Sequence, residues 1–220
     1  IYGKPGDKSL GWYNFNGLCN DTEWKESRHS LDVLRNKKTV QFRIAYGSDG
    51  TARSNNGIAF DNFWIAERNR TVLLEHFTNT SDQDCDSVDA LLNNLANSNE
   101  ESIIDLQYHT SFPGSDPFNQ INPSVPGARV FYYGLSDVPY TVLNGGSKTA
   151  HRFDHQLVSF SGNTILVESL HNSKFGITLN SKVSGNVLNV NAQVYALQDI
   201  PATQLTMHIA VIEKVITGVT

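Results

Sequence analysis

The residues best equipped for chemistry in this sequence are two cysteines, a closely spaced pair of histidines and a glutamate inside an apolar run. Cys19 and Cys85 lie far apart, which excludes a disulfide framework and a zinc-type spacing. A half-buried, unreactive Cys85 and a Cys19–Cys85 bridge both fit this spacing. His151 and His155 lack the neighbouring glutamate of a zinc protease. Two interpretations of the pair stay open, a solvated loop and a metal site. Glu75 requires a partner, either an arginine or a backbone donor.

The composition narrows the class of protein. The 220 residues carry a net charge of −5 and are 39% hydrophobic, and the scattered Lys and Arg form no stripe that would favour nucleic acid. No run approaches the length of a transmembrane helix. Abundant Asn, Ser, Thr and Gly, with three Asn-x-Ser/Thr patterns, favour a location outside the cytoplasm. The abrupt apolar end of the chain leads us to expect a piece of a longer or processed protein.

The middle of the chain alternates strands with helices, which predicts an α/β domain over residues 69–172. A continuous apolar run that begins at Thr71 predicts a strand buried on both faces. A polar turn and a helix follow at once, with Asp82 or Asp84 as N-cap. The expected elements are strands at 71–76, 102–109 and 137–146 and helices at 85–97, 128–134 and 163–170, with a long loop at 111–127.

The sequences on both sides of this α/β domain are typical of antiparallel β structure. Val40 to Tyr46 alternates apolar and polar residues, and three alternating stretches follow at 174–183, 186–197 and 204–216. We therefore predict an α+β multidomain chain. Residues 1–68 would be the last strands of a jelly-roll-like β-sandwich, and residues 173–220 an incomplete sandwich extension.

Five short stretches carry a family resemblance: VLLEHFTN with the helix after it, IIDLQYH, VPYTVLNGG and LTMHIAVIEKVI. Over about residues 70–215 the chain resembles a thioredoxin-like, outer-membrane-protein-related family of surface and secreted proteins from gliding and gut Gram-negative bacteria. The resemblance implies a thioredoxin-like core at 69–172 with a cis bond at Val138–Pro139. The stretch GIAFDNFWI resembles the end of a MAM-type or carbohydrate-binding jelly roll.

The active-site pattern of that family is degenerate in this sequence. Redox-active members carry Cys-x-x-Cys after the first strand, and alignment from Phe77 places Asp82 at the first cysteine and Cys85 at the second. The attacking thiol is therefore missing, and Asp82 and Asp84 would raise the pKa of the remaining thiol. His76 falls where such enzymes often keep a buried acid. We expect no catalytic residue here, only the degenerate pair facing Pro139.

Two further sites follow from the resemblances. In the resembled jelly rolls, an Asp of the last strand and loop oxygens often hold a structural cation, which points to Ca²⁺ at Asp61 with Asp49. A capped turn with a β-bulge at Asp61 is the alternative. Asp86-Ser87-Val88 resembles the short O-glycosylation signal of the same bacteria, which makes Ser87 a candidate acceptor. No other cofactor is expected.

These observations favour a non-catalytic binding or structural module of a larger extracytoplasmic protein, at the cell surface, in the outer membrane or secreted. Its partner would be a protein or a glycan, and missing strands would come from its own longer chain or from a partner. Three alternatives stay open. They are a thiol-disulfide oxidoreductase that uses Cys85, a subunit of a surface filament or secretion assembly, and a carbohydrate-binding or adhesion protein that stacks Trp12, Tyr13, Trp24 or Trp64 on sugars.

Overall fold

The structure is a computed structural model that describes residues 28–44, 60–157, 162–201, 205–213 and 216. The chain divides by its contacts into two units, residues 1–68 and residues 69–220. Across the described residues the protein is mixed α/β. None of the described helices is both long enough and apolar enough to span a membrane.

The first unit contains one short 3-10 helix, Asp32–Leu34, among its described residues and no strand. The strand predicted for Val40 to Tyr46 is absent from its described part, where the side chains of Val40, Phe42 and Ile44 are exposed. Residues 60–68 form no strand either. Alternation in the sequence predicts only which side chains share a face. A strand also needs a neighbouring backbone as hydrogen-bonding partner, and the described residues provide none for these two stretches.

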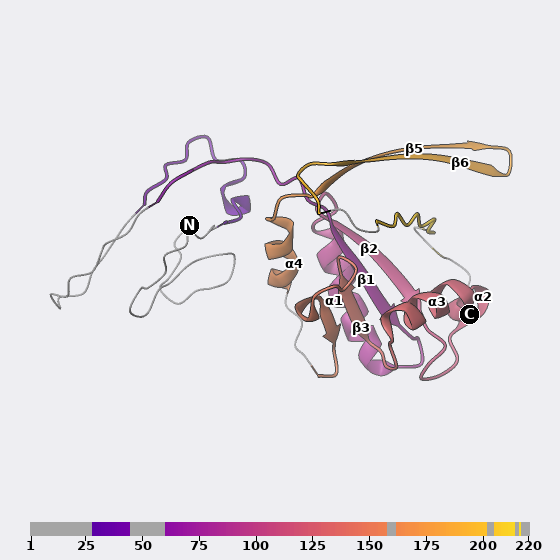
Figure 1. Ribbon diagram of the computed structural model, residues 1–220. Helices are drawn as coiled ribbons and strands as arrows, with labels where there is room; N and C mark the ends of the chain where they lie inside the picture. Colours follow the sequence, from indigo (N-terminus) through magenta and orange to yellow (C-terminus); the bar gives the residue numbers. More distant parts are fainter. Residues whose placement is uncertain (1–27, 45–59, 158–161, 202–204, 214–215, 217–220) are drawn as a thin grey trace. The chain divides into compact units, whose positions relative to one another are not determined.

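The second unit is built on a mixed four-stranded sheet (Figure 1). Its order is β2-β1-β3-β4, with β1 parallel to β2, and with β3 antiparallel to both β1 and β4. The strands are β1 (Val72–Thr78), β2 (Ile103–His109), β3 (Tyr140–Leu143) and β4 (Arg152–Asp154). The central position of β1 explains its continuous apolar sequence, because both of its faces are covered.

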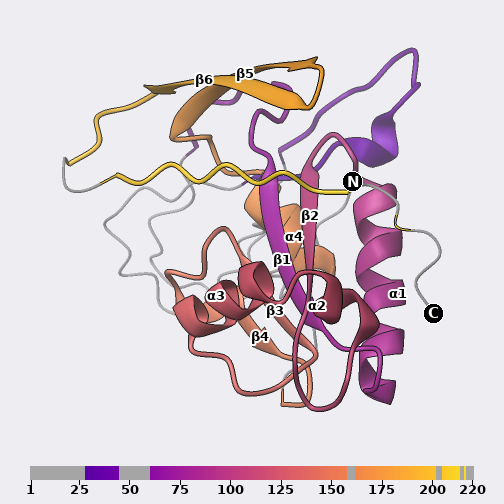
Figure 2. The same ribbon diagram turned by 90° about the vertical axis from the view of Figure 1, so that its right-hand side faces the viewer.

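Helices cover both faces of this sheet, and the arrangement can be followed in Figures 1 and 2. Helices α1 (Gln83–Asn97) and α4 (Gly162–Ser169) pack with Leu74 in one core. Helix α3 (Ser124–Tyr133) packs with Phe77 in the other. Because side chains alternate along a strand, successive residues of β1 point into different layers.

The predicted core elements are confirmed to within a few residues, with two omissions. The short helix α2 (Pro117–Ile121) lies in the stretch predicted as a loop. Its signal was Asp116 before a proline, since Asp116 caps the helix by accepting from the Asn119 N–H at 2.9 Å. The prediction of a loop for 151–155 was wrong, because residues 152–154 form β4, a strand too short to leave a periodic pattern. The Val138–Pro139 bond is cis, as the resemblance implied.

A separate hairpin follows the sheet. Strands β5 (Phe175–Ser184) and β6 (Val187–Ala196) pair antiparallel along their whole length (Figure 1). Gly185 lies in the turn with φ of +59°, a conformation that glycine adopts without strain. The third predicted strand, at 204–216, is absent from its described part, because residues 205–213 form no strand and pair with neither β5 nor β6.

Candidate functional site

In the turn between β1 and α1, the Thr80 N–H donates to buried Asp116 Oδ2 at 2.8 Å. A second buried side chain, that of Asn79, also holds this turn. Its Nδ2 donates to the carbonyl oxygens of Thr110 at 2.8 Å and Gly114 at 3.0 Å. Its Oδ1 accepts from the N–H and the hydroxyl of Ser81. Asn79 is 0% exposed, which excludes it as a glycan acceptor in the folded chain. The turn therefore presents the start of α1 in one defined position at the carboxyl end of β1.

Of the two N-cap residues that the sequence predicts for α1, Asp82 and Asp84, the structure selects Asp82. Its Oδ1 accepts from the backbone N–H of Asp84 at 2.9 Å and of Cys85 at 3.3 Å. Two of the free N–H groups that a helix start leaves are thus bound to a carboxylate. The partial positive charge of the helix end, which would stabilise a thiolate, is offset by Asp82.

Cys85 is a free thiol, 1% exposed, whose Sγ accepts from the Asn79 N–H at 3.4 Å. Burial raises its pKa, and the charges of Asp82 and Asp89 act in the same direction. The sequence pointed to carboxylates as the cause of a raised pKa, but burial contributes more. The expectation of a half-buried side chain was also wrong, because Cys85 packs in the core that contains Phe77. Its predicted bridge partner Cys19 lies outside the described residues.

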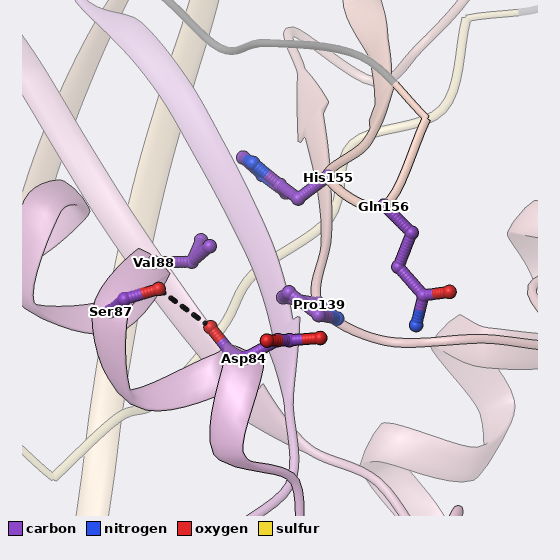
Figure 3. A pocket seen from close by; sticks show the side chains of 6 residues that line it. All are labelled: Asp84, Ser87, Val88, Pro139, His155 and Gln156. Carbon is purple, nitrogen blue, oxygen red and sulfur yellow. Dashed lines mark hydrogen bonds between the residues drawn. The ribbon is translucent and has the colours of Figure 1, made fainter.

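A pocket of about 340 Å³ opens beside the first turns of α1 (Figure 3). Cys85 does not line it. Its walls come from three places in the chain: α1, the start of β3 and the turn after β4. The lining residues are Asp84, Ser87, Val88, Pro139, His155 and Gln156. The pocket therefore offers a carboxylate, a hydroxyl, an amide and an imidazole beside two apolar groups, with no thiol in its wall.

Side-chain hydrogen bonds hold the Pro139 wall of the pocket. Gln156 Nε2 donates to the Val138 carbonyl oxygen at 3.1 Å, and Asp137 Oδ1 accepts from the Val138 N–H at 3.1 Å. His155 Nε2 lies 2.7 Å from Thr141 Oγ1. Burial, and after it the charge of the nearby His76, lower the pKa of His155 to about 4. The imidazole of His155 is therefore neutral at neutral pH and serves the pocket as a hydrogen-bonding group.

Beneath α1, His76 is held between two carboxylates. It is 1% exposed, with Nδ1 2.7 Å from Asp105 Oδ1 and Nε2 3.7 Å from Asp89 Oδ1. Asp89 also accepts from Thr78 and Gln107, and burial raises its pKa. Sequence reasoning identified His76 but missed Asp89. The signal was the helical spacing from Cys85, which places Asp89 one turn later on the side that faces the sheet.

On the opposite face of β1, Glu75 has the arginine partner that its burial required. Arg129 of α3 donates to Glu75 Oε1 from Nε at 3.0 Å, and the Tyr133 hydroxyl donates to Oε2. Burial raises the pKa of Tyr133, and the hydrogen bond to Glu75 raises it further. All polar atoms of the Glu75 carboxylate are satisfied within the fold, which indicates a structural role.

The two histidines four residues apart have separate partners, so the structure does not bring them together as ligands. His151 Nε2 lies 3.0 Å from Glu168 Oε1 of α4, whereas His155 lies against Thr141. Arg70 adds a second ion pair to Glu168 at 3.3 Å. Within the part of the chain that is described, no group of three or more His, Cys, Asp or Glu side chains is placed to hold a metal ion.

The remaining predicted sites are placed only in part. Asp61 accepts from the Asn62 N–H at 2.7 Å. Residues 60–68 form neither a turn nor a strand, so the capped turn with a β-bulge is absent there. The predicted calcium partner Asp49 lies outside the described residues, so that site stays a prediction. Ser87 is exposed on α1, and its hydroxyl donates to the Asp84 carbonyl oxygen at 3.0 Å. Trp64 is 55% exposed, and Arg28 lies 5.6 Å from its ring; Trp12, Tyr13 and Trp24 lie outside the described residues.

No family model matches the chain, and no curated protein matches it significantly.

Proposed function

We propose that residues 69–172 form a thioredoxin-like domain without redox activity, which serves a larger extracytoplasmic protein as a binding module. The order β-α-β with a helical crossover, then two antiparallel strands and a final helix, supports this proposal. So does the sheet order with β1 at its centre. Three of the stretches on which the family resemblance rests fall on β1, β2 and β3, and the helix after the first of them is α1. The last stretch, LTMHIAVIEKVI, forms no strand in its described part and gives no support.

The state of Cys85 carries the proposal. Disulfide exchange requires an accessible thiolate and a second thiol beside it. Cys85 is 1% exposed with a raised pKa, and the position three residues earlier holds the capping carboxylate of Asp82. A buried thiol with a raised pKa, and no second thiol beside it among the described residues, support the proposal of a domain without redox activity.

The pocket beside Pro139 is the proposed binding site. It lies at the carboxyl end of β1, the edge where α/β domains usually bind ligands. Its mixture of Asp84, Ser87 and Gln156 with Val88 and Pro139 suits a short polypeptide segment, which presents amide groups and apolar side chains together. A protein at the cell surface is the partner class we propose.

The absence of redox chemistry is tested by thiol reactivity and turnover. In a Cys19→Ser background, which leaves one thiol, we expect native Cys85 to react with iodoacetamide about 100-fold more slowly than in urea. Insulin reduction should stay at the uncatalysed rate. Turnover that disappears in Cys85→Ser would reject the proposal in favour of an oxidoreductase.

The binding role is tested with peptides selected from a displayed random library on the folded protein. We expect Ser87→Arg, which fills the pocket mouth, to weaken binding about tenfold or more. Ala90→Arg is the matched control, because Ala90 is exposed on the same helix but does not line the pocket. Equal effects of the two substitutions, or no selectable peptide, would count against this site.

A further inference from the structure

The β5–β6 hairpin has two chemically different faces. Residues directly opposite one another in an antiparallel pair share a face, so the pairing assigns every side chain. One face carries polar residues of both strands, together with Val187 and with Tyr195, whose ring lies against Gly176. The other face is apolar except for Ser181. Its members are Phe175, Ile177, Leu179, Val183, Leu188, Val190, Ala192, Val194 and Ala196.

The apolar face is uncovered in the described chain. Ile177 is 68% exposed and Leu179 is 60% exposed, although both lie in the middle of a regular ladder. A two-stranded hairpin is marginally stable in water unless its apolar face is covered. A contiguous apolar surface of this kind is a mark of an interaction site. The hairpin therefore requires an occupant that the described residues do not supply.

We propose that this occupant is a second copy of the same chain, with the two hairpins packed apolar face to apolar face. The apolar face carries no charge, since Lys182 is the single charged residue of the hairpin and lies on the polar face. Two identical faces can therefore meet without burying an ionised group, as an isologous interface requires. A charged partner would find no complementary group there.

The size of the face matches what a dimer needs. A strand of this length extends about 33 Å, so the hairpin offers a long and narrow surface. Burial of one Val, Leu or Ile side chain removes roughly 60–120 Å² from water, so five such side chains with their smaller neighbours remove about 500 Å² per copy. Two copies bury roughly 1,000 Å², the lower bound for a specific interface. Sheets that meet this way form a two-layer sandwich.

This interface is independent of the pocket and of the proposed binding function. None of the residues that line the pocket belongs to β5 or β6. A protein that proves monomeric would therefore not contradict the thioredoxin-like assignment. A peptide bound in the pocket would not change the dimer dissociation constant.

The test is the molar mass of the full chain by analytical ultracentrifugation from low to high micromolar concentration. We expect a reversible dimer. Leu179→Lys places a charge at the centre of the apolar face and should raise the dimer dissociation constant about tenfold or more. Asn180→Lys is the matched control, because it adds the same charge one residue along on the polar face and should leave the constant unchanged. Should Leu179→Lys unfold the hairpin, Val194→Thr removes an apolar group with little change in shape and should still weaken the dimer.

Three results would overturn the proposal. One is a monomer at every concentration. Another is a dimer that responds equally to Leu179→Lys and Asn180→Lys, because the interface would then lie elsewhere. The third is a monomer in which Leu179→Lys, but not Asn180→Lys, lowers the melting temperature. That result would show that the face is covered within the chain, with the apolar segment 205–213 as the first candidate.

Discussion

At the scale of single residues, two neighbours in β1 illustrate how the fold accommodates buried polar side chains. Glu75 points toward α3 and pairs with Arg129, whereas His76 points toward α1 and lies between Asp89 and Asp105. Because the strand is buried on both faces, neither side chain can reach water, and each needs a partner from a different layer. Polar residues in this apolar strand thus fix the positions of the layers on both of its faces.

Glu75→Gln should destabilise the second unit by about 3 kcal/mol, because it leaves the Arg129 guanidinium partly buried without its counter-charge. Urea unfolding followed by circular dichroism measures the change. The double variant with Arg129→Met should recover part of the loss, since no charge is then left unpaired. A single variant as stable as the wild type would show that the ion pair is dispensable.

Asp116 should contribute stability that depends on pH. Burial alone would raise its pKa, but hydrogen bonds from the N–H groups of Thr80 and Asn119, with His109, outweigh burial and hold the pKa below 3.8. A carboxyl with a lowered folded pKa stabilises the fold above its unfolded value and loses that contribution as pH falls through its folded value. Asp116→Asn should therefore cost about 1 kcal/mol near pH 7 and less near pH 3, as measured by urea unfolding. A constant difference would contradict this.

At the scale of elements, α1 begins with a capping carboxylate at the position where the resembled family carries its reactive cysteine. The carboxylate of Asp82 occupies the N–H groups of Asp84 and Cys85, and Asn79 fixes the turn before it. A helix end with its donors already bound has little left to offer an external anion or a thiolate. The local hydrogen bonding thus favours stability over reactivity.

Asp82→Ala should lower the free energy of unfolding by about 1 kcal/mol, because it removes the acceptor for two backbone N–H groups. Asp82→Asn should retain most of the stability, since its amide oxygen can still cap. Asp86→Ala is a control for charge alone, because Asp86 lies in the same first turn without capping it. Equal losses in Asp82→Ala and Asp86→Ala would mean that charge, and not the cap, matters.

At the scale of the whole molecule, the described chain combines a well-packed core with surfaces that lack a cover. The sheet has two cores, one on each face. The hairpin and segment 205–213 keep many large apolar side chains exposed, among them Leu205 at 69% and Val211 at 75%. Exposed apolar surface of this extent is typical of chains that function within an assembly.

Intact-mass spectrometry of the protein from its natural source tests the extracytoplasmic prediction. We expect a mass above the 24.4 kDa of this chain, with a sugar increment. An increment that maps to Ser87 on α1 would place the sugar at the pocket and would count against peptide binding there. Ser87→Ala should remove that increment and leave other modifications in place. A bare mass with an unmodified Ser87 would remove this support for the cell-surface location.

The sequence by itself determined the local elements and the absence of a Cys-x-x-Cys pattern after the first strand. The period of the apolar residues, the capping Asp82 and the lone Cys85 are readable because they depend on neighbours in the chain. Only the tertiary structure decided what depends on distant residues: the Glu75–Arg129 pair, the burial of Cys85 and the short strand β4. It also decided against the strands predicted at 40–46 and 204–216 in their described parts, whereas the two strands predicted between them are present as β5 and β6. A strand exists only where another backbone satisfies its hydrogen bonds, and no local pattern contains that partner.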